Sequence, residues 1–185
     1  MLVVALAAGC GSASADVGVG PGPANYTVQP QPAPGSCHYR TATNGQSLPD
    51  SNCTPGAVNP KVTSDTLEAT ICRAGYTKSI RPPADITEIE KKANAAAYGY
   101  SGRLSGAEYD HLVPLELGGD PNDPRNLWVE PGRSPNQKDD VEAQLHDLVC
   151  QGAVRLTVAQ QAIATDWTTA INVVASETAP MDRDR

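Results

Sequence analysis

An aspartate followed directly by a histidine is the first place in this 185-residue chain where the residue types suit catalysis. Asp110 and His111 lie within residues 108–115, a stretch that we predict to be a strand. A neutral imidazole has an ordinary pKa of about 6.5 and accepts a proton from water near neutral pH. A carboxylate supplies the hard oxygen that Mg²⁺ and Mn²⁺ prefer. Such a pair suits metal-assisted hydrolysis, although an isolated one is more often a surface acid beside a loop histidine.

Further polar residues follow this pair at defined distances. Gly118, Gly119 and the cluster of Asp, Asn and Pro after them predict a loop. Asn126 comes 15 positions after His111 and opens a second short strand, so the two strands form a hairpin with a long connection. Asn136, ten positions further on, precedes a helix whose apolar residues recur at helical spacing. The predicted order is strand, loop, strand, helix.

This ordered set resembles the motif of the HNH (ββα-metal) endonucleases. The residues that carry the resemblance are Asp110-His111, Pro114, Gly118-Gly119, Asn126-Leu127 and Asn136. The wider likeness covers about residues 66–175 and is to exported bacterial members of the family. It implies an α+β fold, a small ββα-metal core with flanking helices, and hydrolysis of phosphodiester bonds.

The resemblance assigns roles to three of these residues. His111 is the base that takes a proton from water, and Asp110 reaches a divalent ion, most simply Mg²⁺ or Mn²⁺. Asn126 corresponds to the central asparagine, whose amide ties the loop between the strands and orients the base. We therefore expect Asn126 to bond backbone groups rather than substrate.

The start of the helix supplies the last position of the motif. Asn136 is the expected ligand there, and Lys138 and Asp139 are the alternatives, because one helical residue is about 100° of rotation. Asn136 would also serve as the N-cap of the helix. Glu108, on the same strand face as Asp110, is a reserve ligand.

Cations near the motif are candidates to contact substrate phosphates. Arg103, Arg125 and Lys138 are the principal ones, with Lys78 and Arg81 as further candidates. A net charge of −7 gives no basic surface for passive binding of nucleic acid, so binding would depend on a metal ion and local cations. DNA is the favoured substrate over RNA. We expect no organic cofactor and a monomer.

Two further helices are predicted around the motif. Thr87 and Glu90 form a capping box for a helix over residues 88–98. Thr157 and Gln160 cap a last helix that continues to about Ile171. Both tryptophans, Trp128 and Trp167, are assigned to the core, and His146 to the surface of the preceding helix.

The chain before the motif reads as an export signal and a tether. Residues 1–10 are apolar and end in Ala-Ala-Gly-Cys, which predicts either a lipoprotein signal with lipid on Cys10, and so a membrane anchor, or a plain secretory signal. Residues 11–60 are rich in Pro and Gly and predict an extended, disordered tether. Residues 61–175 are then the nuclease-like domain and residues 176–185 a tail.

The remaining cysteines fit an exported protein. Four cysteines allow three disulfide connectivities. They show no CxxC spacing, which argues against a structural zinc site. We favour Cys37–Cys53 and Cys72–Cys150, because each bond then closes within its own region. A second hypothesis remains open beside the exported nuclease, namely a non-catalytic envelope lipoprotein that uses the ββα scaffold for binding or structure.

Overall fold

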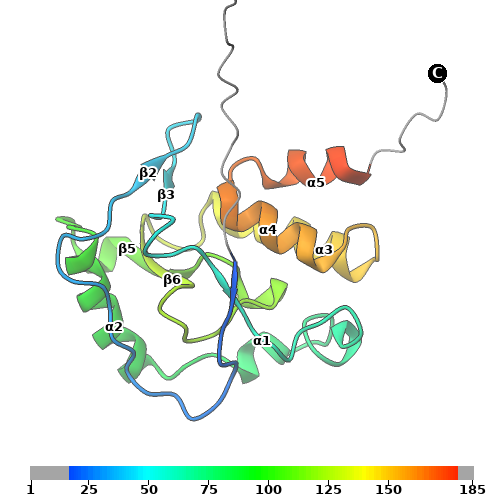
Figure 1. Cartoon of the computed structure of the whole chain (residues 1–185), viewed down its shortest axis with the longest axis horizontal. Coiled ribbons are helices and arrows are strands. Elements are labelled where there is room, and N and C mark those ends of the chain that lie inside the picture. Colours follow the sequence, from blue (N-terminus) through cyan, green and yellow to red (C-terminus); the bar gives the residue numbers. More distant parts are fainter. Residues whose placement is uncertain (1–16, 179–185) are drawn as a thin grey trace, which may run out of the picture.

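The computed structural model describes residues 17–178 and has an α+β fold, as the sequence predicts (Figure 1). Its helices are α1 (Tyr76–Ser79), α2 (Ala84–Ala97), α3 (Gln137–Cys150), α4 (Leu156–Asp166) and α5 (Ala170–Thr178). Its strands are β1 (Gly18–Val19), β2 (Arg40–Thr41), β3 (Ser47–Leu48), β4 (Ala57–Val58), β5 (Ala107–His111) and β6 (Leu127–Pro131). Three short 3-10 helices complete it: η1 (Leu67–Ala69), η2 (Leu104–Gly106) and η3 (Leu115–Leu117).

The hairpin β5–β6 and helix α3 follow one another in the predicted order. The two strands are antiparallel, with Glu108 opposite Glu130 and Asp110 opposite Trp128. The first strand is shorter than predicted and ends at His111, because the chain turns there into η3. Gly119 permits that turn: a Cβ at this position would lie 1.7 Å from the carbonyl oxygen of Val113.

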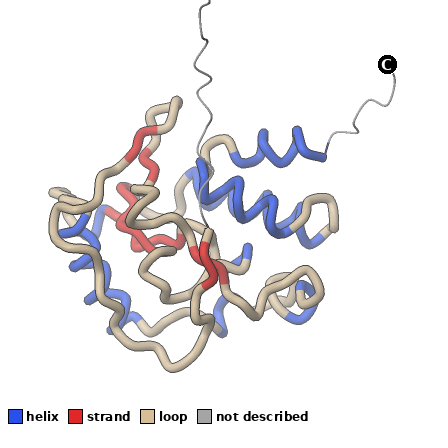
Figure 2. The backbone as a smooth tube through the Cα atoms, in the orientation of Figure 1, coloured by secondary structure: helices blue, strands red, loops and turns tan. Residues whose placement is uncertain are grey.

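Helices cover the hairpin from two sides. Helix α2 packs against β6, while α3 packs against η3, α4 and α5. In Figure 2 the strands lie between α2 on one side and α3, α4 and α5 on the other. Trp128 and Trp167 are both buried in the core, as predicted, and Leu145 and Ile163 bring the inner faces of α3 and α4 into the same cluster.

Two predicted helix starts are wrong. Helix α2 begins at Ala84 behind Pro83 with no side-chain cap, so Thr87 lies inside it. Proline at that place has its φ already fixed and has no N–H to satisfy. Glu90 accepts the backbone N–H of Gln29 instead of capping the helix. Helix α4 likewise begins at Leu156 without a side-chain cap.

The predicted last helix is in fact two helices. The side chain of Asp166 accepts hydrogen bonds from the backbone N–H and the hydroxyl of Thr168, at 2.9 and 2.6 Å. These local bonds end α4 and redirect the chain into α5, in the way that aspartate commonly competes with helical bonding. The apolar period of the sequence continues through the break because both helices pack on one core.

Residues 17–60 are part of the folded domain and not the predicted tether. Strand β1 pairs in parallel with β4, and β2 pairs with β3. Gly22 donates its N–H to the buried carboxylate of Asp120 at 2.6 Å, and Gln29 donates to Glu90 at 2.7 Å. The segment is therefore held by backbone bonds to polar side chains of the domain and by scattered apolar side chains, such as Cys37 and Leu48, in the core. Such contacts leave no hydrophobic period, which is why the composition indicated a tether.

Both favoured disulfides, Cys37–Cys53 and Cys72–Cys150, are present. They indicate an oxidising, non-cytoplasmic compartment. No helix within residues 17–178 has the length and apolar character that crossing a membrane requires. The predicted signal segment and its Cys10 lie outside the described residues.

The two disulfides give a direct test of the folded N-terminal segment. Replacing Cys37 and Cys53 together by serine should lower the free energy of unfolding by about 3 kcal/mol, because the bond closes a 16-residue separation. Replacing Cys72 and Cys150, which are separated by 78 residues, should lower the free energy of unfolding by about 4.5 kcal/mol. Urea unfolding measures both. An unchanged stability in the first variant would mean that the segment is a tether after all.

Candidate active site

A small polar cavity lies between the β5–β6 hairpin and the start of α3. Its volume is about 90 Å³. Strand β5 contributes Glu108, Asp110 and His111 to its wall, and α3 contributes Asp139 and Glu142. The remaining lining residues are Arg81, Tyr109, Pro114, Leu115 and Ser134. The structure thus brings the predicted base and the predicted ligands of the first strand to one place.

The position of His111 at the end of β5 makes this arrangement feasible. Neighbouring residues of a strand point to opposite faces, so Asp110 and His111 cannot share a cavity in mid-strand. His111 is the last residue of β5, and the chain turns immediately after it. Both residues are buried and both line the cavity.

A buried lysine holds Asp110 in place. The Nζ of Lys138 lies 2.8 Å from Oδ2 of Asp110, donates to the backbone carbonyl of His111 at 2.9 Å, and bonds Glu142 one turn along α3. The indole N–H of Trp128 donates to the same Oδ2 at 3.1 Å. Within residues 17–178, the other oxygen of Asp110 takes part in no hydrogen bond or ion pair. That oxygen is therefore available to a cation.

Lys138 is not the phosphate contact predicted from the sequence. Its side chain is 1% exposed, so substrate cannot reach it. Burial alone would lower the pKa of the ammonium group, but the carboxylates of Asp110, Glu142 and Glu130 outweigh burial and raise the pKa well above its ordinary value. Lys138 is a permanent internal cation of the site.

Carboxylates nevertheless outnumber this one buried cation. Burial raises the pKa of Glu108, Glu130 and Glu142, and for Glu108 and Glu130 the charge of Asp110 is the next largest cause. Glu108 and Glu130 lie opposite each other in the hairpin, and the Oε2 atom of each is buried without a hydrogen-bond partner. Like charges in such a pair repel each other. The raised pKa values show that the charged forms of these glutamates are disfavoured, and an added cation would stabilise them.

These features fit a divalent cation with a preference for oxygen ligands. The cavity presents Glu108, Asp110 and Glu142, and hard carboxylate oxygens suit Mg²⁺ or Mn²⁺. These three carboxylates do not form a closed cage. In the part of the chain that the structure describes, the only three His, Cys, Asp or Glu side chains that bring one ligand atom each within 4.8 Å of the others are Cys72, His146 and Cys150. An ion in the cavity would keep several waters, as Mg²⁺ usually does.

His111 has the tautomer that a base requires. Its Nε2 lies 3.0 Å from the carbonyl oxygen of Pro121. A carbonyl only accepts, so Nε2 carries the proton and Nδ1 has the free lone pair. Burial lowers the pKa of His111 to about 4, and the imidazole is neutral at pH 7.

Asn126 bonds only backbone groups, as we expected from the sequence. Its side chain is fully buried, and its amide donates to the carbonyl oxygens of Val113 and Asp120 at 2.9 and 3.0 Å. Its Oδ1 accepts the N–H of Val113 at 3.0 Å and that of Ala57 at 3.4 Å. One side chain thus joins both ends of the loop between the strands to β4.

Asn136 is an N-cap and does not line the cavity. Its Oδ1 accepts the N–H of Lys138 at 2.7 Å, while the Asp139 carboxylate accepts the N–H of Asn136 at 2.6 Å. From the helix, Glu142 and Asp139 line the cavity instead. The sequence offered a signal for Glu142, since it follows Lys138 by four positions and so shares its helix face. The ligand candidates predicted from the sequence all lie in or before the first turn of the helix.

The predicted arginine contacts lie away from the cavity. Arg125 pairs with Asp123 at 2.6 Å and donates to the carbonyl oxygen of Val19, so it fastens the N-terminal segment. Arg103 is exposed and is not part of the cavity wall. Arg81, named only as a further candidate, does line the cavity, and its charge contributes to lowering the pKa of His111.

Comparisons with known proteins give no independent identification. No protein-family model matches the chain, and no similar curated protein or solved structure was found. The assignment of function therefore depends on the geometry of the cavity and on the motif.

The role of Lys138 can be tested by its removal. Lys138→Met should lower the free energy of unfolding by about 3–5 kcal/mol, because it leaves the carboxylates of Asp110 and Glu142 buried without their cation. Urea unfolding in the presence of a chelator measures the change. Lys92→Met, at an exposed position of α2, is the control and should stay within about 0.5 kcal/mol of the parent. Equal stability of the two variants would contradict the buried ion pairs.

Proposed function

We propose that this protein is a metal-dependent, largely sequence-nonspecific endonuclease of the HNH (ββα-metal) type that acts outside the cytoplasm. The observation that carries the proposal is the cavity in which Asp110, His111 and Glu108 meet Glu142 between a hairpin and a helix start. The order of the elements and the resemblance of the motif support it. DNA is the favoured substrate.

His111 is the general base of the proposed reaction. Nδ1 takes a proton from the attacking water, while the bond from Nε2 to Pro121 holds the ring in its orientation. Asp110, Glu108 and Glu142 would hold the divalent ion, which supplies a positive charge for the phosphate oxygens and the departing 3′ oxygen. Lys138 and Trp128 fix the Asp110 carboxylate on its other side.

Arg81 is the cation best placed to meet a substrate phosphate. It is exposed and lines the cavity, whereas Lys138 is buried and Arg125 is engaged with Asp123. A single accessible guanidinium suits recognition of the backbone without reading of bases. The net charge of −7 keeps passive binding weak. Attachment to a membrane through lipid on Cys10 belongs to the same proposal.

Loss of the base should slow cleavage strongly. His111→Ala should lower the rate of plasmid nicking with Mg²⁺ or Mn²⁺ by about 10²- to 10⁴-fold, the usual contribution of a general base. Gel electrophoresis of the nicked product measures the rate. His38→Ala is the matched control and should cut like the parent, because His38 is exposed and does not line the cavity. If His111→Ala cuts as fast as the parent, the assignment of the base is wrong.

Metal binding distinguishes the proposed nuclease from the second hypothesis, a non-catalytic envelope protein. A ligand of the folded state at 100 times its Kd adds about 2.7 kcal/mol to the free energy of unfolding. Millimolar Mg²⁺ or Mn²⁺ should therefore raise the melting temperature of the parent, and Glu108→Gln combined with Asp110→Asn should remove the effect. No shift in the parent would favour a binding or structural envelope protein, in which Lys138 alone satisfies Asp110.

A further inference from the structure

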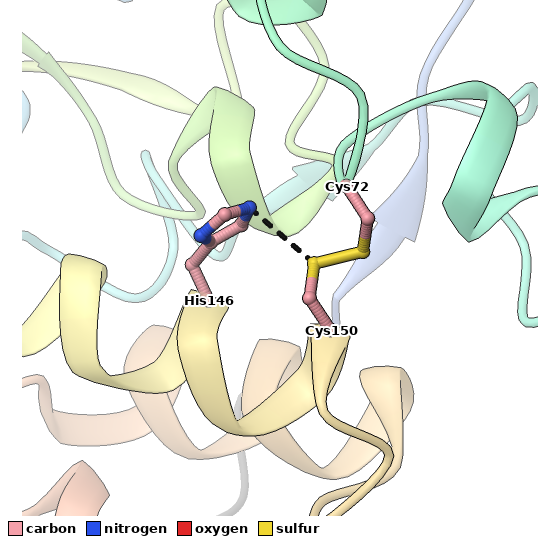
Figure 3. A group of neighbouring side chains, drawn as sticks. All are labelled: Cys72, His146 and Cys150. Atoms are coloured by element: carbon pink, nitrogen blue, oxygen red, sulfur yellow. Dashed lines mark hydrogen bonds between the residues drawn. A yellow bond between two sulfur atoms is a disulfide. The ribbon is translucent and has the colours of Figure 1, made fainter.

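A second group of metal-ligating side chains lies outside the proposed active site. Cys150 is the last residue of α3, His146 lies one turn before it, and Cys72 follows η1 (Figure 3). One donor atom from each lies within 4.8 Å of the others, and all three side chains are partly buried. None of them lines the carboxylate cavity.

In the oxidised chain this group is not a metal site. Cys72 and Cys150 form a disulfide, and metal ions bind thiolates. The His146 Nε2 lies 3.0 Å from the carbonyl oxygen of Ile71 and 3.4 Å from Sγ of Cys150. A proton on Nε2 satisfies that carbonyl. The imidazole therefore acts here as a hydrogen-bond donor beside the disulfide.

We propose that the chain in which this disulfide is reduced binds one divalent ion that prefers thiolate ligands, such as Zn²⁺, through Cys72, Cys150 and His146. Disulfide and ion are then alternative links between the same two segments, the turn after η1 and the end of α3. Soft thiolates with one imidazole select such an ion, whereas the carboxylate cavity suits harder ions. The proposal is independent of the nuclease function.

The distances match a tetrahedral site once the distance between the two sulfurs increases. With Zn–S of about 2.3 Å and Zn–N of about 2.05 Å, tetrahedral geometry places sulfur and nitrogen about 3.6 Å apart and the sulfurs about 3.8 Å apart. The distance from Nε2 of His146 to Sγ of Cys150 is already 3.4 Å. The Cα atoms of the two cysteines are 5.6 Å apart, so rotation of the side chains can separate the sulfurs once the bond is broken. A water would fill the fourth position.

The helix also prepares the ligands. His146 and Cys150 are four positions apart, so they lie on one face of α3. Binding at Nε2 requires the imidazole proton to move to Nδ1, where a carboxylate oxygen of the exposed Asp147 lies 3.7 Å away, too far for a hydrogen bond. A modest rotation of the Asp147 side chain would bring it to the far side of the ring, where carboxylates usually support a ligating histidine.

The chemistry of the exchange balances with a phosphine as the reductant. The phosphine gives two electrons to the disulfide and takes the oxygen atom of one water molecule, so it becomes a phosphine oxide. The two hydrogens of that water end on the two sulfurs, which become thiols. Binding of the ion then releases both thiol protons. A chain in which the disulfide has not yet formed already holds these thiols and needs no reductant.

Cobalt(II) is a suitable probe, because a thiolate ligand gives it a charge-transfer absorption that oxygen ligands do not. The full chain is reduced with a phosphine and titrated with Co²⁺ in excess Mg²⁺, which competes for any site made of oxygen ligands alone. We expect the reduced parent to bind one more equivalent of Co²⁺ than the oxidised parent. This equivalent should show the charge-transfer absorption of a thiolate ligand. Cys72→Ser combined with Cys150→Ser should lose this equivalent, and His146→Ala should weaken its binding.

Cys37→Ser combined with Cys53→Ser is the matched control, because it removes the other disulfide and should retain the equivalent. Zn²⁺ should also slow the re-oxidation of Cys72 and Cys150 in the parent but not in His146→Ala. A reduced parent, folded or not, that binds no more Co²⁺ than the variant lacking Cys72 and Cys150 overturns the proposal. Dependence on Cys37 and Cys53 would overturn it as well.

Discussion

The contact on which the candidate site depends is the buried ion pair between Lys138 and Asp110. An ammonium group that is 1% exposed is costly unless carboxylates and carbonyls surround it, and here Asp110, Glu142 and the carbonyl of His111 do so. Because Lys138 is in the first turn of α3 and Asp110 is in β5, this network fixes the helix start against the hairpin. The cavity lies along that contact.

The same network leaves the site with a need for positive charge. One lysine faces Asp110, Glu130 and Glu142, and Glu108 lines the cavity close by. Burial keeps the pKa values of these glutamates raised, and two of their oxygens have no partner. Replacing such residues by apolar ones is often neutral or stabilising, so stability alone does not account for them. The pattern supports the cation site that we propose.

The sequence predicted those parts of the molecule that depend on local pattern. The hairpin, the helix behind Asn136 and both disulfides follow from spacing and turn chemistry, whereas the backbone role of Asn126 was implied by the resemblance of the motif. It failed where partners are distant in sequence. Nothing local shows that Lys138 is buried, or that Gln29 donates its N–H to Glu90, because neither contact produces a hydrophobic period.

The geometry also explains why residues that never touch substrate belong to the site. Asp110 and His111 can line one cavity only because β5 stops at His111, and the strand stops there because the chain turns at once. Asn126 holds that turn by bonding Val113 and Asp120, and Gly119 leaves room for the Val113 carbonyl. The placement of the base is thus a property of the loop, and the loop is as necessary to the proposed chemistry as the imidazole.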